Sequence, residues 1–224
     1  MTKKNMKKVI LFGSGKTAQV MSYHIQREGG AVAAFAVDRK FMKASTVLNT
    51  PVVPFDSVTE AFPAEEFDMM IAVGYKLGNR LRAERVLQAE EMGYNLISYV
   101  SPTAIIWDEL RVQTNCKIGE KTIMQPFSKI GNNVFIGSGC IIGHHSEVMD
   151  HCFISSGVIV GGGVTLEPYC FLGSGSITRN DITIGKASVI GAGVTMLENT
   201  RPESVYLNRS AEKMNISSKS LNLL

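Results

Sequence analysis

Large aliphatic side chains recur at every sixth position through the second half of the chain. From Val112 onward, this series holds aliphatic or Met residues at all but one position, Thr178. A second series, four residues behind and starting at Cys116, holds small residues except at Ile182, in the same hexad as Thr178. A volume exchange within one hexad keeps the local packing constant. Neither the 3.6-residue period of a helix nor strand alternation produces this spacing.

A six-residue repeat predicts a parallel β-helix, a prism with three short faces. One coil then takes eighteen residues, and successive coils stack about 4.8 Å apart, as hydrogen-bonded strands do. Fifteen hexads predict five coils. Glycine follows the large position in eight of them, where a tight corner leaves little room for a Cβ atom. All four cysteines lie in the small series, so we expect them to be packing residues without metal-ligand spacing.

The first hundred residues show a different pattern. Buried strands are predicted at residues 8–12, 31–37 and 67–73, and helices from the Gly-rich turn to about Glu28 and over 81–92. Alternating strands and helices favour a parallel, doubly wound sheet. We therefore predict an α/β nucleotide-recognising domain at 1–100, a β-helix at 101–205 and a tail at 206–224.

The turn after the first strand reads Gly13-Ser14-Gly15-Lys16-Thr17-Ala18. It is not a P-loop, because Ile10 stands where the first glycine would be needed. As a dinucleotide fingerprint it reads G-x-G-x-x-A, and Asp38 follows at about the distance of a ribose-binding acid. The alternative is a tight turn with no ligand. We favour a half-size Rossmann module whose helix N-terminus holds the phosphates of a nucleotide, with Lys16 nearby.

Charge and composition limit the partners. Lys and Arg number 23 against 20 Asp and Glu, a net charge of +3, so nucleic acid is not expected as a partner. The apolar run after the N-terminal lysines is too short for a signal peptide or a membrane span. We expect a cytoplasmic protein with no membrane partner and reduced cysteines.

With these motifs in place, the sequence resembles the hexapeptide-repeat acyltransferases, which fold as left-handed parallel β-helices and usually work as trimers with active sites between subunits. The Gly-rich turn, the segment 72–76 (AVGYK), the segment 97–102 (ISYVSP) and the segment 142–145 (IGHH) narrow the resemblance. With these segments together, the chain is similar to the sugar acyltransferases of the sialic-acid O-acetyltransferase and bacillosamine-pathway N-acetyltransferase group.

This resemblance implies two binding sites. The N-terminal domain would hold a nucleotide-linked amino sugar, with the diphosphate near the Gly-rich turn, the base near Asp38 and the sugar near the 72–76 segment. The substrate-binding candidates are Gly13, Ser14, Gly15, Asp38, Gly74, Tyr75 and Lys76. Acetyl-CoA would lie on the β-helices of a homotrimer, and no metal is expected. The resemblance implies Gly162, Ser174 and Ala192 as cofactor-binding candidates, and Ser156 and Gly157 join them because this run leaves room for close approach of a ligand to the backbone.

Acyl transfer from a thioester needs a base for the attacking nucleophile, and imidazole suits this task near neutral pH. The resemblance places the base at His144, with His145 as its rival. Relatives have a glutamate directly after the base, where this chain has His145, so the orienting carboxylate must come from elsewhere, and Asp150 and Glu147 are the local candidates. The chain has two further departures. Phe153 replaces a cofactor-contacting histidine, and the tail at 208–213 differs from the usual closing sequence.

The sequence thus favours N-acyl, most simply N-acetyl, transfer to a nucleotide-linked amino sugar. O-acetylation of a sugar hydroxyl is the near alternative. Zinc chemistry of the β-helical carbonic anhydrase type is a further alternative, because His144, His145 and His151 lie within eight residues. A nicotinamide-dependent reductase would need a fuller Rossmann domain. His24, in the first helix, is expected to be a surface or packing residue.

Overall fold

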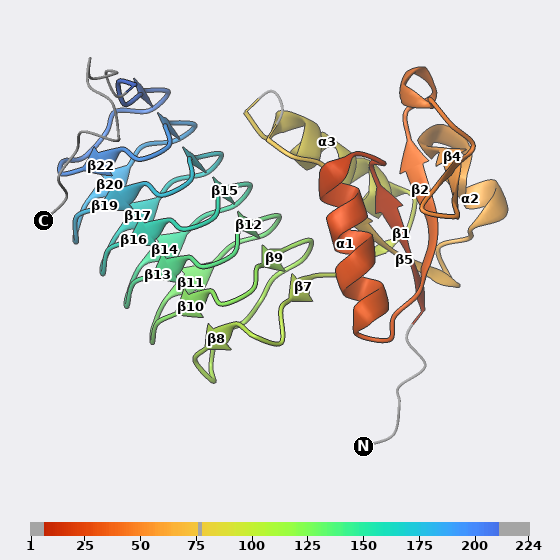
Figure 1. Cartoon of the computed structure of the whole chain (residues 1–224), viewed down its shortest axis with the longest axis horizontal. Helices are drawn as coiled ribbons and strands as arrows, with labels where there is room; N and C mark the ends of the chain where they lie inside the picture. Colours follow the sequence, from red (N-terminus) through yellow and green to blue (C-terminus); the bar gives the residue numbers. More distant parts are fainter. Residues whose placement is uncertain (1–6, 76–77, 211–224) are drawn as a thin grey trace, which may run out of the picture.

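The computed structural model describes residues 7–75 and 78–210. An α/β domain is followed by a long three-sided coil of short parallel strands, and the two parts lie side by side (Figure 1). The N-terminal sheet has the order β3-β4-β2-β1-β5-β6, in which only β3 runs antiparallel to its neighbour. Its strands are β1 (Lys8–Phe12), β2 (Val32–Val37), β3 (Thr46–Val47), β4 (Thr50–Pro54), β5 (Phe67–Ile71) and β6 (Asn95–Leu96).

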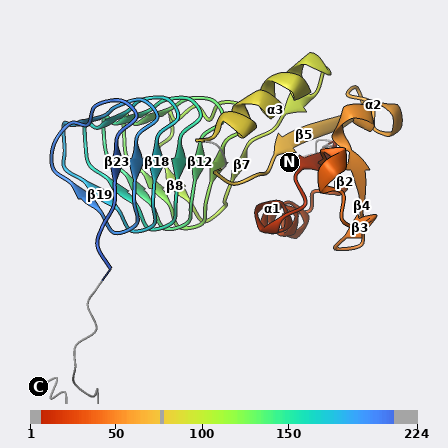
Figure 2. The same cartoon turned by 90° about the horizontal axis from the view of Figure 1, so that it is seen from above.

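Helices cover both faces of this sheet: α1 (Lys16–Arg27) lies on one side, and α2 (Val58–Ala61) and α3 (Arg80–Glu91) lie on the other (Figure 2). Successive side chains of a strand point to opposite faces. Leu11 therefore packs in one apolar cluster with Met21 of α1, while Ile10 packs in a second cluster with Val86 of α3. Two 3₁₀ turns, at Arg39–Phe41 and Phe55–Ser57, complete the domain.

The predicted strands and helices of this domain are present, but β3, β4 and β6 were not predicted from the sequence. Strand β4 contains Pro51 and Pro54, and proline in a run argues against a strand unless it lies near an edge. Strands β3 and β6 have two residues each, too few for a periodic signal.

The second half is a parallel β-helix whose three faces are three sheets. The first face contains β7 (Tyr99–Val100), β9 (Lys117–Ile118), β12 (Phe135–Ile136), β15 (Phe153–Ile154), β18 (Phe171–Leu172), β21 (Val189–Ile190) and β23 (Val205–Tyr206). The second contains β8 (Ile105–Ile106), β10 (Ile123–Met124), β13 (Ile141–Ile142), β16 (Ile159–Val160), β19 (Ile177–Thr178) and β22 (Thr195–Met196). The third contains β11 (Lys129–Ile130), β14 (Glu147–Val148), β17 (Thr165–Leu166) and β20 (Thr183–Ile184).

The eighteen-residue coil predicted from the sequence is confirmed by the strand register. Ile123 pairs with Ile141, which pairs with Ile159, and the other two faces keep the same step. Every member of the large series except Val112 is buried, and so is every member of the small series except Val194. The four cysteines lie inside the prism, where each behaves as a small apolar residue.

Each corner of the prism has one residue in the left-handed region, with φ between 51° and 72° along the three stacked columns. We call the corner between the first and second faces the first corner, that between the second and third faces the second corner, and that between the third and first faces the third corner. The left-handed residues of the first corner are Lys121, Gly139, Gly157, Gly175 and Gly193. Those of the second corner are Phe127, His145, Gly163 and Asp181, and those of the third are Asn115, Asn133, His151, Tyr169 and Ala187.

The α/β domain docks on the first face. Phe135 and Phe153 stack with ring centroids 4.3 Å apart on its outer surface, and Phe171 continues this ladder. Tyr75, just after β5, packs 4.3 Å from the ring of Phe171. Phe153, at a position where the resemblance implies a cofactor-contacting histidine, is thus part of the contact between the two parts of this chain.

A chain of amide hydrogen bonds also joins the two parts. The backbone N–H of Ile71, at the end of β5, donates to the side chain of Asn115. Asn115 donates to Asn133, and Asn133 lies 3.0 Å from Nδ1 of His151. The end of β5 is therefore fixed to the third corner of the β-helix.

Helix α1 forms a further contact between the two parts through His24. Its Nε2 lies 2.9 Å from Oε1 of Glu120, and its ring stacks on Tyr99. Burial raises the pKa of Glu120, but a hydrogen bond from Ser138 and the charge of His24 outweigh it, and the net shift is downward. His24 is 7% exposed and packs between the domains. Of the two roles expected from the sequence, surface or packing, it has the packing role.

Candidate active site

The carboxyl end of the N-terminal sheet contains a cavity of about 360 Å³. It lies where strand order reverses, because α1 carries the chain from β1 to β2 on one side while β5 pairs with β1 on the other. Ligands of open α/β sheets bind at this kind of position. Gly13, in the loop after β1, permits close approach of the loop after β5. Its φ is 107°, and a Cβ atom there would lie 2.9 Å from Cγ1 of Val73.

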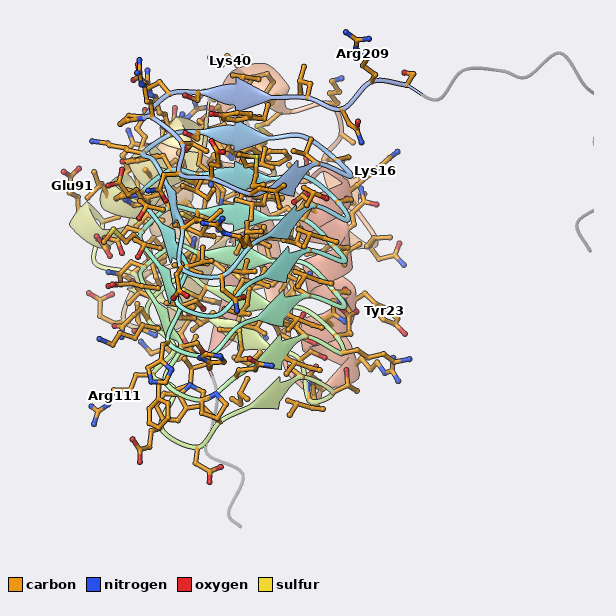
Figure 3. The ribbon with its side chains drawn as sticks, turned by 90° about the vertical axis from the view of Figure 1, so that its left-hand side faces the viewer. Lys16, Tyr23, Lys40, Glu91, Arg111 and Arg209 are labelled. Atoms are coloured by element: carbon orange, nitrogen blue, oxygen red, sulfur yellow. The ribbon has the colours of Figure 1, made fainter. Side chains whose placement is uncertain are left out.

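The structure brings together six of the seven substrate-binding candidates at this cavity. They are Gly13, Ser14, Gly15, Asp38, Gly74 and Tyr75. Lys76 lies outside the described residues. Gly15 is the N-cap of α1 and has no side chain to occupy the first backbone N–H groups of the helix. A helix N-terminus of this kind binds phosphate, and the exposed Lys16 lines the same cavity; its side chain points away from α1 in Figure 3.

Asp38 reaches the cavity from the end of β2, but its Oδ2 is already paired. Nη2 of Arg85, on α3, lies 3.0 Å away and donates to it. Burial would lower the pKa of Arg85, whereas its hydrogen bonds to Asp38 and Glu84 raise it, and the net shift is upward. Sequence reasoning missed Arg85, because nothing in the α3 pattern marks one arginine as the partner of a residue 47 positions away.

His144 lies at the second corner, exposed to solvent. Its backbone N–H donates to Oε1 of Gln125 in the preceding coil at 2.9 Å. Its ring lies against Gly162 in the following coil, so closely that a Cβ atom on Gly162 would come within 2.7 Å of Nε2. Gly162, predicted as a cofactor-binding residue, thus makes the space that the His144 ring occupies.

His145 turns toward His144, and their Nδ1 atoms are 3.1 Å apart. The backbone of His145 is left-handed, with φ at 58°, and its N–H donates to the carbonyl of Pro126. Its ring packs 4.7 Å from that of Phe127, which in turn contacts Trp107. His145, at a position where the resemblance implies a glutamate, is therefore itself the side-chain partner of His144.

Asp150, the predicted orienting carboxylate, lies at the third corner. Its Oδ1 accepts a hydrogen bond from the backbone N–H of Asn132 at 2.7 Å, one coil away. Glu147 points outward from the third face. The structure brings neither carboxylate to His144. The ring of His145 lies beside His144 instead.

The predicted cofactor-binding residues divide between two corners. Ser156 and Gly157 lie at the first corner, in successive coils with Ser174 and Ala192, so that four of the five share one edge of the prism. Gly162 lies with His144 at the second corner. Strands β13, β16 and β19 of the second face separate these two edges within one chain.

Among the described residues, no group of three or more His, Cys, Asp or Glu side chains is placed to hold a metal ion. His151 lies at the third corner and contacts Asn133 and Tyr169, so it does not converge with His144 and His145 within one chain. Within the ranges that the structure describes, no helix combines the length and apolar character needed to span a membrane.

Comparison of the sequence with family models gives one match, to the bacterial transferase hexapeptide model of six repeats, over residues 127–162. Comparison with curated proteins gives no significant match. The sequence family model thus covers part of the β-helix, including the second corner with His144 and His145.

Solved structures match over almost the whole chain. A mutant of perosamine N-acetyltransferase from Caulobacter crescentus, in complex with CoA and GDP-perosamine, has a TM-score of 0.83 at 23% identity, covering 90% of this chain and 93% of that one. The acetyltransferase domain of PglB from Neisseria gonorrhoeae has a TM-score of 0.81 at 20% identity, covering 93% and 100%. WeeI from Acinetobacter baumannii has a TM-score of 0.80 at 18% identity, covering 90% and 96%.

These comparisons confirm the fold class predicted from the sequence, a half-Rossmann domain followed by a left-handed parallel β-helix. The chain carries the hexapeptide repeat of bacterial transferases and shares its fold with a perosamine N-acetyltransferase and with the acetyltransferase domain of PglB.

Proposed function

We propose that the protein transfers an acyl group, most simply acetyl, from acyl-CoA to the amino group of a nucleotide-linked amino sugar. The observation that carries the proposal is the cavity of about 360 Å³ at the carboxyl end of the sheet, lined by the Gly13–Gly15 turn and Asp38. It has the size and the phosphate-binding helix N-terminus that a nucleotide requires. The fold neighbours include a structure with CoA and GDP-perosamine bound, which supports the same acceptor class.

The chemistry is assigned to the second corner. His144 takes the proton of the acceptor amine as the nitrogen attacks the thioester carbonyl. Backbone N–H groups stabilise the tetrahedral oxyanion, and CoA thiolate leaves as the amide bond forms. The imidazole of His144, packed against Gly162 and exposed on its other side, supports this role, because an acceptor can approach it from solvent.

CoA is assigned to the first corner, along Ser156, Gly157, Ser174 and Ala192. This edge and the His144 edge are separated by one face of the prism, so one chain does not bring the thioester to its own His144. We therefore infer a homotrimer in which the first corner of one subunit meets the second corner of another. The boundaries 1–100, 101–205 and 206–224 and a cytoplasmic location belong to the same proposal. Strand β7, at Tyr99–Val100, already pairs with β9 of the β-helix, so strand pairing in the β-helix begins two residues before the proposed boundary at residue 101.

A thiol-release assay tests the proposal directly. The protein is incubated with acetyl-CoA and a panel of nucleotide-linked amino sugars, alongside matched nucleotide sugars that carry a hydroxyl in place of the amine. We expect CoA release with at least one amino sugar, its loss in His144→Gln, and its retention in the surface control Lys43→Gln. Release only with the hydroxyl set would establish O-acetylation instead, and no release with either set would refute acyl transfer to these acceptors.

A further inference from the structure

The contact between His144 and His145 determines which imidazole nitrogen can act as a base. The two Nδ1 atoms are 3.1 Å apart, a hydrogen-bond distance. A neutral imidazole has one N–H and one lone pair, so one of these nitrogens donates and the other accepts. If His144 donates, its Nε2 has a free lone pair. If His145 donates, Nε2 of His144 carries the proton and cannot accept another.

We propose that His145 is a positioning residue whose neutral Nδ1 accepts the hydrogen bond from Nδ1–H of His144. This inference rests on the proposed acyl transfer. It gives His145 the role that a carboxylate has in a His–carboxylate pair, with an uncharged acceptor. Nε2 of His144, which lies against Gly162, is then the nitrogen that takes the amine proton.

The backbone of the second corner holds His145 in this orientation. Its φ of 58° is set by the corner, and its N–H donates to the carbonyl of Pro126 in the preceding coil. The ring of Phe127 covers one side of the imidazole at 4.7 Å. The ring of His145 therefore has few alternative positions, and it restricts the rotation of the exposed His144 ring through the Nδ1 contact.

Among the residues that the structure describes, those in contact with the pair are uncharged. Gln125, Pro126 and Phe127 belong to the preceding coil, and Gly162 to the following coil. Asp181 shares the column of His145 but lies beyond Gly163, where its carboxylate approaches that glycine. When His144 becomes an imidazolium, its Nδ1–H donates to a neutral partner. A second proton on His145 would place two like charges within hydrogen-bond distance of each other.

Two variants of His145 separate this role from a structural one. His145→Gly removes the ring and tolerates a φ of 58° without strain. We expect it to lower kcat by about 10- to 100-fold with little change in KM, because His144 loses its orienting acceptor. His145→Glu restores a hydrogen-bond acceptor that carries a negative charge. We expect most of kcat to return and the acid limb of the kcat–pH profile to move to higher pH, because a carboxylate stabilises the imidazolium of His144.

Full kcat in His145→Gly, or an unchanged acid limb in active His145→Glu, would overturn the inference. Loss of activity in His145→Gly together with retained activity in His144→Gln would also overturn it, because His145 would then be the base. If the His145 ring had only a structural role, the acid limb of the kcat–pH profile would be the same in His145→Gly and His145→Glu.

Imidazole ¹⁵N NMR of the substrate-free protein provides a readout that does not depend on turnover. We expect His144 as the Nδ1–H tautomer and His145 as the Nε2–H tautomer, with assignments from the single variants. The reverse pair of tautomers would refute the inference even if acyl transfer is found. The expected pair in a protein that transfers no acyl group would instead refute the proposed function and leave the positioning contact intact.

Discussion

The side-chain amide of Asn133 lies 3.0 Å from Nδ1 of His151, and this contact sets the protonation state of a histidine between the two domains. Asn115 donates to the oxygen of Asn133, so the nitrogen of Asn133 faces the imidazole. An amide nitrogen only donates, so Nδ1 of His151 accepts and the ring is neutral. The sequence grouped His151 with His144 and His145, but the structure gives it a role in domain docking.

Acidic pH should therefore weaken the docking of the α/β domain. Burial lowers the pKa of His151 and Arg82 lowers it further, whereas Asp150 opposes them. The unfolded chain takes up its proton at about pH 6.5, above the folded pKa. Between the two values the unfolded state binds more protons, so the free energy of unfolding falls as pH falls.

Thermal unfolding at about pH 7.5 and about pH 5 measures this effect. His151→Asn is the matched variant, because asparagine adopts a positive φ readily and its amide oxygen can accept from Asn133. We expect a smaller loss of Tm on acidification in the variant than in the unsubstituted protein. Equal losses would mean that His151 does not carry the pH dependence.

Arg82 presents a buried charge whose cost can be measured. It is fully buried in the first turn of α3, and none of its three guanidinium nitrogens has a hydrogen-bond partner among the described residues. Its guanidinium lies 5.7 Å from the ring centre of Phe135, and burial lowers its pKa to about 10. Arg82→Met keeps most of the volume and removes the charge, so we expect the free energy of unfolding to rise by about 1–4 kcal/mol. Urea denaturation measures this free energy, and a lower value in Arg82→Met than in the unsubstituted protein would show that the guanidinium has a stabilising partner.

Two glycines at the first corner should differ in how much a substitution lowers stability. A Cβ atom on Gly137 would lie 2.5 Å from the backbone nitrogen of Ser156, whereas one on Gly139 would meet nothing within 4 Å. Gly137→Ala should cost about 1–3 kcal/mol or more, since neither backbone can yield without breaking the coil stacking. Gly139→Asn should change stability little, because asparagine accepts its φ of 67°. Denaturant titration of both variants checks this order, and equal costs would argue against the coil spacing described above.

The N-cap of α1 offers a test of phosphate binding. Gly15 has extended backbone angles and open space where a side chain would lie. Gly15→Asp should cap α1 and stabilise the fold by a few tenths of a kcal/mol or more, since Asp caps better than Gly. Its carboxylate would also occupy the N–H groups and repel a diphosphate, so nucleotide-sugar affinity should fall at least tenfold. Gly15→Asn caps without charge and should lose less affinity in calorimetric titration, and unchanged binding in both variants would contradict a phosphate site there.

The interior of the β-helix could be predicted from the sequence because one property, side-chain size, repeats with one period. The left-handed position of each corner could not, because these positions hold residues as different as Asn115, His151 and Tyr169, and no chemical pattern links them. The cavity at the carboxyl end of the sheet could be predicted from a local motif, the Gly13–Gly15 turn. The partners of Asp38 and His144 could not, because Arg85 comes from a distant helix and the approach of His145 depends on a corner conformation that glycine, histidine and phenylalanine all adopt.

The second corner, which carries His144, is opposite the first face, on which the α/β domain docks. The central claim is therefore that the shared site also joins the cavity of one subunit to the His144 edge of another. Complementation tests it most directly. Gly15→Asp, defective in the cavity, and His144→Gln, defective in the base, are assayed for thiol release separately and after subunit exchange. We predict that the mixture regains activity well above the sum of the two variants, because some of its sites combine an intact cavity with an intact His144. A mixture no more active than that sum, with subunit exchange verified by mass, would contradict a site shared between subunits.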